Sequence, residues 1–291
     1  MNHLQQIQKW MKINNIDLFI INRTDEFLNE YIAPYAERLK WISNFSGSAG
    51  RALILQNQAI IFVDGRYTFQ AHQQVDSQYF GIEHLKDYWS SLDNNIKVST
   101  SIGIDPSLHS NFEIQKIESI VQKKSSTIKY LEENPIDILW IDQPIYPRSK
   151  AFIQEEKYSG KSVLDKLQEI QSKLASTSIN YYLLTCLDSI AWLLNIRGND
   201  ILHTPLIFSF AIVSQSKKIE LFIDHSKIAN IKNKLDNIVN FQPFKNIKYF
   251  LNTINNNSIV GIDENRTAYI FKKNCHDMKI TTHYLADPCV Y

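Results

Sequence analysis

The residues best suited to chemistry follow an apolar segment and read Asp64-Gly65-Arg66-Tyr67. A guanidinium at the end of a strand can bind a carboxylate or a carbonyl oxygen at the rim of a site, because its planar fork matches those groups. Asp-Gly is also a common tight-turn dipeptide, since glycine tolerates positive φ, and the local sequence favours this turn. Both interpretations stay open, and Arg66 is the candidate substrate-binding residue.

Aspartates end four apolar segments, and carboxylates in such positions could hold the metal ions of a two-metal nuclease. They are Asp64, Asp105, Asp224 and Asp263. Their symmetric placement in the two halves of the chain and the near-neutral net charge favour helix capping and turn formation instead.

Other reactive residue types lack the spacing that a known site requires. Gly47-Ser48-Ala49-Gly50 could cradle an anion, but it matches neither the P-loop nor the dinucleotide-binding pattern, so a tight loop between strands is favoured. Cys275-His276-Asp277, His283 and Cys289 lack the CxxC or HxxxH spacing of a metal site. No GxSxG motif is present. The residues alone therefore assemble no catalytic apparatus.

The composition is that of a soluble globular protein long enough for two domains. The 291 residues are 44% hydrophobic and 21% charged, with a formal net charge of +1. This balance argues against binding to nucleic acid or to an anionic membrane surface. Three cysteines, the lack of a signal-peptide pattern and the shortness of the apolar runs favour a cytoplasmic location.

The two halves of the chain repeat the same plan. Each half opens with apolar residues at helical spacing, followed by a short apolar segment typical of a buried strand. These are Leu4, Ile7 and Met11 before residues 18–21, and Leu164, Leu167 and Leu174 before residues 181–184.

Matched motifs continue the duplication. Trp41, Asn44 and Gly47 have the same offsets as Trp192, Asn195 and Gly198; residues 61–64 correspond to 221–224, and 102–105 to 260–263. We also expect a second, matching helix in each half, around residues 117–121 and 228–235.

Helices that alternate with short strands predict an α/β fold in which helices cover a sheet. Residues 52–63 read as a hairpin that turns at Gln56-Asn57-Gln58, so we expect antiparallel neighbours within a mixed sheet. The irregular segment 143–160 marks the division between the halves. We place the first domain at residues 1–157 and the second at residues 158–291.

Together these motifs resemble the N-terminal region of the three-domain, cytosolic-type Xaa-Pro aminopeptidases (aminopeptidase P) of the creatinase and metallopeptidase family. In the first half the similar segments are 30–34, 45–50 and 63–71. In the second half they are 158–163 and the long signature 187–201, while 138–140 with Pro144 and Pro147 resembles the inter-domain segment. The resemblance covers nearly the whole chain.

The resemblance implies two tandem creatinase-type N-terminal domains, each a ribonuclease-H-like mixed sheet flanked by helices. It places a third, pita-bread catalytic domain after residue 291, with the ligands of two divalent metal ions, usually manganese. By this resemblance the chain itself carries no catalytic residue and no metal.

In the family, a hydroxide that bridges the two metal ions attacks the carbonyl of the bond before proline, and the N-terminal domains roof the catalytic cleft. Arg66 matches the arginine of the family's Asp-Gly-Arg-Tyr motif, so the resemblance makes it a peptide-contacting residue. It also implies short peptides with proline at the second position, the chain's own C-terminal catalytic domain and a homodimer of the full enzyme as partners. Neither nucleic acid nor a membrane is expected.

Two positions depart from the family pattern. Arg51 stands where the family usually has threonine, and His203-Thr204-Pro205 replaces His-Asn-Pro. We expect both departures to lie in loops.

Two other functions stay open. The chain could be a stand-alone, non-catalytic module that binds peptides or proteins with the same fold, and the coding sequence beyond Tyr291 distinguishes this alternative. A metal-dependent nuclease is the least favoured alternative, and a cleavage assay on duplex and hybrid substrates would test it.

Overall fold

The computed structural model describes residues 1–290 and divides the chain into two compact units. The first contains Met1–Asp25 and Pro34–Ile145, and the second contains Glu26–Ala33 and the chain from Tyr146 onward. Phe27 lies in the second unit, where it packs against Phe208 at a ring-centroid distance of 4.7 Å. The domain boundary expected between residues 157 and 158 stays a prediction.

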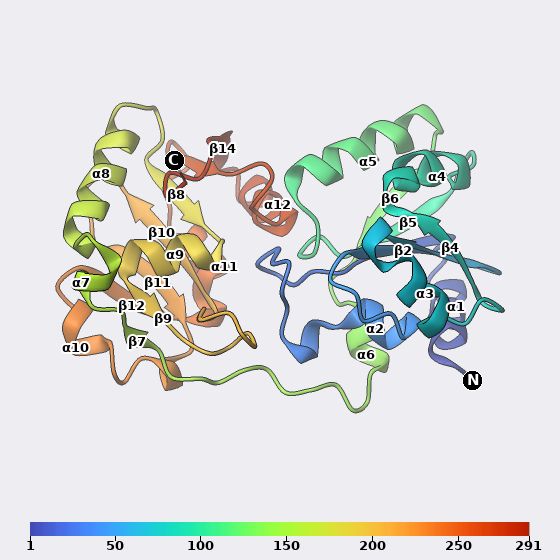
Figure 1. Ribbon diagram of the computed structural model, residues 1–291. Helices are drawn as coiled ribbons and strands as arrows, with labels where there is room; N and C mark the ends of the chain where they lie inside the picture. The colour runs from blue at the N-terminus through green and yellow to red at the C-terminus, as the bar shows by residue number, and fades with distance from the viewer. Residues whose placement is uncertain (291) are drawn as a thin grey trace. The chain divides into compact units, whose positions relative to one another are not determined.

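The first unit is a mixed sheet covered by helices (Figure 1). Its strands are β1 (Leu18–Asn22), β2 (Gly50–Leu55), β3 (Ala59–Val63), β4 (Phe80–His84), β5 (Ser101–Ile104) and β6 (Thr127–Tyr130). Its helices are α1 (His3–Ile13), α2 (Arg38–Ser43), α3 (Thr68–Gln74), α4 (Tyr88–Asn95), α5 (Asn111–Lys123) and α6 (Pro135–Leu139), with 3₁₀ turns η1 (Pro34–Ala36), η2 (Gly65–Tyr67) and η3 (Leu85–Asp87). The strand order is β4-β3-β2-β1-β5-β6.

The second unit repeats this sheet strand for strand, in the order β12-β11-β10-β8-β13-β14. These strands are β8 (Tyr181–Leu184), β10 (Ser209–Ser214), β11 (Ile219–Ile223), β12 (Val239–Pro243), β13 (Ile259–Ile262) and β14 (Thr281–Tyr284), and β7 (Phe152–Ile153) pairs separately with β9 (Ile196–Arg197). The helices are α7 (Glu156–Ser159), α8 (Val163–Ala175), α9 (Leu187–Leu194), α10 (Lys232–Leu235), α11 (Ile247–Leu251) and α12 (Tyr269–Asp277), with 3₁₀ turns η4 (His225–Lys227) and η5 (Phe244–Asn246).

Strand pairing confirms the expected mixed α/β fold. The hairpin β2–β3 is antiparallel, and so is its counterpart β10–β11. By contrast, β3 runs parallel to β4 and β11 runs parallel to β12. The two units are therefore tandem copies of one mixed-sheet domain.

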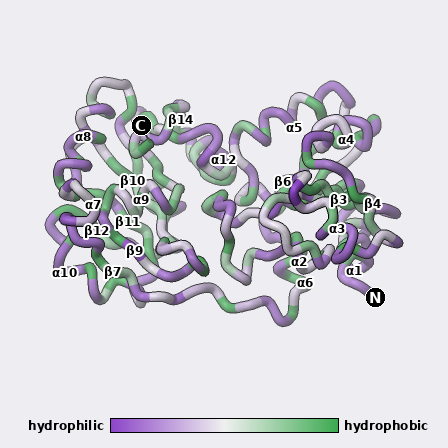
Figure 2. Tube along the Cα trace, in the orientation of Figure 1, coloured by the Kyte–Doolittle hydropathy of each residue, from purple (hydrophilic) through white to green (hydrophobic). Residues whose placement is uncertain are grey.

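The central strands of each sheet are buried on both faces, and their successive side chains point to opposite sides. Phe222 of β11 meets Phe250 of α11 at 5.5 Å, whereas the residues that flank Phe222 belong to a core formed with α8, α9 and α10. In the first unit, Phe62 of β3 meets Tyr88 of α4 at 5.3 Å, and its neighbours face α1, α2 and α3. Figure 2 shows hydrophobic residues concentrated along the central strands of each unit.

The helical pattern at the start of the second half is confirmed by α8, in which Leu164 is 50% exposed and the buried residues are Lys166, Leu167, Ile170 and Leu174. One expectation about the helices needs correction. The helices expected at 117–121 and 228–235 are not counterparts: α5 follows β5 and corresponds to α12 after β13, whereas residues 228–235 follow β11 and end in the short α10. The spacing of apolar residues does not show which helix of one unit corresponds to which helix of the other, because that correspondence depends on the order of strands in the sheet.

The repeated glycine of the Ile-Gly-Ile-Asp and Val-Gly-Ile-Asp motifs has a packing reason in both units. A Cβ on Gly103 would lie 3.1 Å from Ile16, which precedes β1. A Cβ on Gly261 would lie 2.7 Å from Tyr182 and 2.9 Å from Ile179, which precedes β8. Only glycine lets the strand approach these side chains so closely.

Arg51 lies in β2 rather than in a loop, so the expectation for this departure was wrong, whereas His203 lies in a turn with a left-handed φ of 61°. The Arg51 guanidinium forms a salt bridge with Glu113 of α5 and lies 4.8 Å from the ring centroid of Tyr88. This partly buried strand position accepts arginine because a carboxylate and an aromatic face receive its charge.

Glu113 is ionised although its surroundings oppose this. Burial disfavours the charged carboxylate, but His109, whose Nδ1 lies 3.6 Å from Oε2, and the salt bridge with Arg51 hold its pKa at about 2. A carboxyl with a pKa below its unfolded value stabilises the fold above that unfolded value, near pH 4.5, and this contribution is lost as the pH falls towards 2.

We expect Gly261→Ala to lower the free energy of unfolding by about 1–3 kcal/mol, because the added methyl group overlaps Tyr182 and Ile179. Urea denaturation measures the change. Gly81→Ala is the control, since its nearest neighbours lie 3.9 Å from the new Cβ. Equal stability of Gly261→Ala and the wild type would contradict the packing argument.

We expect Glu113→Gln to destabilise the chain by about 2–3 kcal/mol at pH 7, because Arg51 loses its buried counter-charge. The difference from the wild type should shrink as the pH falls from about 5 towards 2. Chemical denaturation at stepped pH values measures this, with the exposed Glu118→Gln on the same helix as the control. A difference that is independent of pH would show that the charge of Glu113 is not responsible.

Candidate functional site

The turn after β3 both forms a tight bend and presents Arg66. The Asp64 carboxylate accepts hydrogen bonds from the backbone N–H of Arg66 at 3.0 Å and from its Nε at 2.8 Å. These hydrogen bonds hold the pKa of Asp64 below its usual value. The side chain of Arg66 is 67% exposed, and its guanidinium lies 5.5 Å from the ring centroid of Tyr67. The turn interpretation is therefore confirmed, and within this turn Asp64 orients the exposed arginine; binding by Arg66 stays a prediction.

The loop Gly47-Ser48-Ala49-Gly50 lies beside this turn at the same edge of the sheet. The backbone N–H of Asp64 donates to the carbonyl of Ala49 at 3.4 Å, and the hydroxyls of Ser48 and Tyr67 are 2.8 Å apart. A Cβ on Gly47 would lie 2.2 Å from the ring of Phe45, so glycine is required for this loop to fold back on itself. The loop packs under the Arg66 turn, as the tight-loop interpretation predicts.

His84 completes the edge and had no assigned role in the sequence. The parallel register of β3 and β4 places His84 opposite Val63, and a Cβ on Gly65 would lie 3.0 Å from His84 Nε2. Val63 and His84 lie 21 positions apart along the chain. No short motif joins them, and only the strand pairing brings them together.

This site can bind but lacks the parts of a nucleophilic catalyst. An exposed guanidinium, oriented by a carboxylate, can hold a carbonyl or carboxylate oxygen. Phe69 on α3, 75% exposed, adds an apolar surface close to it in the chain. The geometry thus gives an edge of the sheet centred on the exposed Arg66, whose side chain Asp64 orients.

The other strand-end aspartates form turns and caps, which confirms the capping interpretation. Asp105 accepts from the backbone N–H of Ser107 at 2.9 Å. Asp224 accepts from that of Ser226 at 2.8 Å. Asp263 accepts from that of Asn265, also at 2.8 Å.

The cysteine and histidine residues near the end of the second unit do not converge. Cys275 is fully buried, whereas the side chain of His276 is 89% exposed. Burial raises the pKa of the Cys275 thiol to about 11, which makes it a poor nucleophile at neutral pH. Across residues 1–290, no group of three or more histidine, cysteine, aspartate or glutamate side chains is arranged to hold a metal ion.

The helices within residues 1–290 include none with the length and apolar character needed to cross a bilayer.

Comparison with known proteins identifies the two repeats. Residues 3–144 match the family described as creatinase/prolidase N-terminal domain, and residues 142–290 match a second family with the same description. A probable Xaa-Pro aminopeptidase P of Paracoccidioides brasiliensis is 32% identical over 250 residues, which cover 84% of this chain and 40% of that protein. One of Aspergillus fumigatus is 33% identical over 230 residues, which cover 77% of this chain and 35% of that protein.

A solved structure has the same fold. The X-prolyl aminopeptidase of Caenorhabditis elegans, described as a cytosolic enzyme with a di-nuclear active site, aligns with a TM-score of 0.87 at 22% identity. The alignment covers 98% of this chain and 50% of that chain. The chain thus spans half or less of the length of each of these three proteins. It belongs to the creatinase/prolidase N-terminal domain family and is homologous to the N-terminal region of the Xaa-Pro aminopeptidases P.

Proposed function

We propose that this chain is the N-terminal part of a two-metal Xaa-Pro aminopeptidase, which removes the N-terminal residue that precedes proline. Its two units roof the catalytic cleft, and the metal ions, with manganese as the expected metal, are held by a C-terminal catalytic domain. The substrates are short peptides with proline at the second position. The full enzyme is expected in the cytoplasm and can form a homodimer.

The observation that carries the peptide-binding role is the exposed Arg66, fixed by Asp64 at the end of β3. A peptide presents carbonyl oxygens and a terminal carboxylate, and the planar guanidinium binds both. Because Asp64 engages Nε, the side chain is held in one direction before the peptide arrives. Such preorganisation lowers the entropic cost of binding.

We expect Arg66→Ala in the complete enzyme to lower kcat/KM for an Xaa-Pro peptide by about 10- to 100-fold, the range for loss of a hydrogen bond from a charged group. The effect should fall mainly on KM, and the metal content measured by atomic absorption should not change. Arg66→Lys, which keeps the charge but not the fork, should give an intermediate value. Lys9→Ala on α1 is the exposed control, and an unaltered kcat/KM in Arg66→Ala would remove Arg66 from the site.

We expect the isolated chain, with added manganese, to release no N-terminal residue from an Xaa-Pro peptide, whereas the complete enzyme does so under the same conditions. The reason is that hydrolysis needs the two metal ions, and the resemblance places all of their ligands in the C-terminal domain. Release by the purified isolated chain would contradict this division of roles. A coding sequence that stops at Tyr291 would favour the stand-alone binding module instead.

A further inference from the structure

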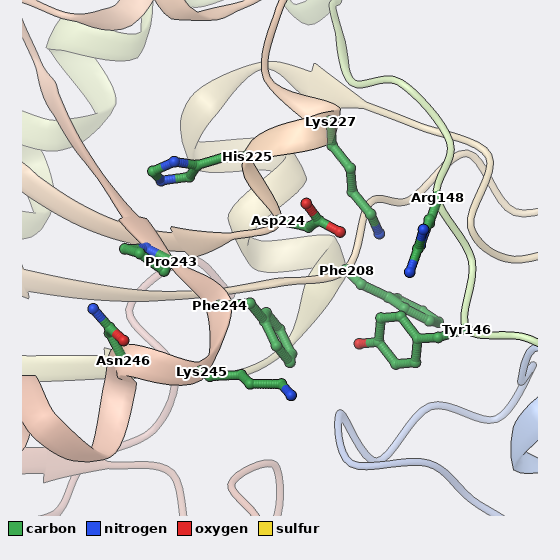
Figure 3. Close-up of a pocket in the computed structure, with 10 residues that line it drawn as sticks. All are labelled: Tyr146, Arg148, Phe208, Asp224, His225, Lys227, Pro243, Phe244, Lys245 and Asn246. Atoms are coloured by element: carbon green, nitrogen blue, oxygen red, sulfur yellow. The ribbon is translucent and has the colours of Figure 1, made fainter.

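The second unit contains a cavity of about 810 Å³ where the parallel strands β11 and β12 end (Figure 3). Pairing of Ile223 with Pro243 brings the two turns η4 and η5 side by side. The carboxyl ends of neighbouring parallel strands are a common place for ligand sites in α/β folds. This position corresponds to the Arg66 edge of the first unit.

Aromatic rings form one wall of the cavity. The ring centroid of Tyr146 lies 5.3 Å from that of Phe208 and 6.1 Å from that of Phe244. Phe244 stacks in turn on Phe210 at 5.2 Å, so the wall continues into the core of the unit. A ligand with an apolar group can therefore bury it against fixed rings.

A buried ion pair borders the wall. Lys227 and Asp200 are both fully buried, and their Nζ and Oδ2 atoms are 2.5 Å apart. The Lys227 Nζ atom lies 5.3 Å from the ring centroid of Phe208. Burial lowers the pKa of Lys227, and the Asp200 carboxylate opposes this shift. The charge of Lys227 is thus neutralised by Asp200 inside the protein, so this pair adds no net charge to the cavity.

The surplus charge comes from Arg148 and Lys245, which are exposed and line the same cavity. Figure 3 shows Arg148 pointing towards Phe208 and Tyr146, and Lys245 extending past Phe244 on the other side of the rings. Asp224 offsets part of this charge: its pKa is lowered first by the hydrogen bonds from Ser226 and then by the charges of Lys227 and Arg148. Three cations, Lys227, Arg148 and Lys245, therefore face two carboxylates, Asp200 and Asp224, and a single positive charge remains.

The net charge of the residues around the cavity favours one class of ligand. One surplus positive charge beside an aromatic wall suits a monoanion with an apolar body better than a doubly charged phosphate. A carboxylate next to an apolar side chain has this form, and partial exclusion of water by the rings strengthens its attraction to the cations.

The two repeats differ at this position. Asp64-Gly65-Arg66-Tyr67 corresponds to Asp224-His225-Ser226-Lys227, so the second unit keeps the capping aspartate but has serine in place of Arg66. Its cations come from elsewhere: Arg148 precedes β7, and Lys245 lies in η5. The second strand end has therefore kept the turn and acquired a different set of binding groups.

We propose that this cavity binds a carboxylate ligand with an apolar side chain, with Arg148 and Lys245 holding the carboxylate and Phe244 and Tyr146 holding the side chain. The carboxylate can belong to a free N-acylated amino acid or to the C-terminus of a peptide. This site lies on the second repeat and does not depend on the peptidase role of Arg66.

Calorimetric titration of the isolated chain with N-acetylphenylalanine and with its neutral amide tests the proposal. We expect the acid to bind at least about 10-fold more tightly than the amide, since only the acid forms the charge-assisted contacts, and we expect salt to weaken its binding. Gly-Gly-Phe and its amide form a second pair, and tighter binding of this acid than of N-acetylphenylalanine assigns the site to peptide C-termini. Equal binding of acid and amide, no saturable binding of either acid, or tighter binding of inorganic phosphate would overturn the proposal.

Charge-removing variants locate the binding. We expect Arg148→Gln and Lys245→Gln each to raise the Kd of N-acetylphenylalanine by about 10- to 100-fold, the range for one lost hydrogen bond to a charged group. Both residues are exposed, so the fold should be retained, and circular dichroism checks this. Lys248→Gln, an exposed lysine of α11 outside the cavity, is the matched control. A Kd unchanged in the first two variants, or raised equally in Lys248→Gln, would exclude this cavity as the site.

Discussion

Parallel pairing of two strand ends is the constraint on which both candidate sites depend. In the first unit, β3 and β4 end together, which sets the Arg66 turn beside His84. In the second unit, β11 and β12 end together and open the aromatic cavity between η4 and η5. Because parallel strands place their carboxyl ends at one edge of the sheet, residues distant in sequence meet there.

The capping aspartate is the part that both edges share. Asp64 and Asp224 each close a 3₁₀ turn by accepting a backbone hydrogen bond two residues ahead. The turn therefore forms whatever residue occupies the next positions, which leaves those positions open to change. Arg66 in one copy and Ser226 in the other show this divergence, and the chemistry of each edge follows from it.

Charged side chains usually lie at the protein surface, but this fold accommodates some that are partly or fully buried by pairing them with an opposite charge. Arg51 is balanced by Glu113 within the first unit, and Lys227 is balanced by Asp200 within the second. Loss of one partner in such a pair costs far more than loss of an exposed ion pair, because the remaining charge stays desolvated. These pairs fix the β2 and η4 backbones that lead into the two edges.

The sequence determined the features that depend on local chemistry: the duplicated helix-strand plan, the hairpin, and the Trp-x-x-Asn motif, whose Asn44 and Asn195 take left-handed φ values of 63° and 50° where helices α2 and α9 end. It also determined the family through long motifs. Tertiary structure decided which helices correspond, that Arg51 lies in a strand, that His84 meets Gly65, and that Arg148 and Lys245 line one cavity. These relations depend on strand order and register across long stretches of chain, which local residue patterns do not encode.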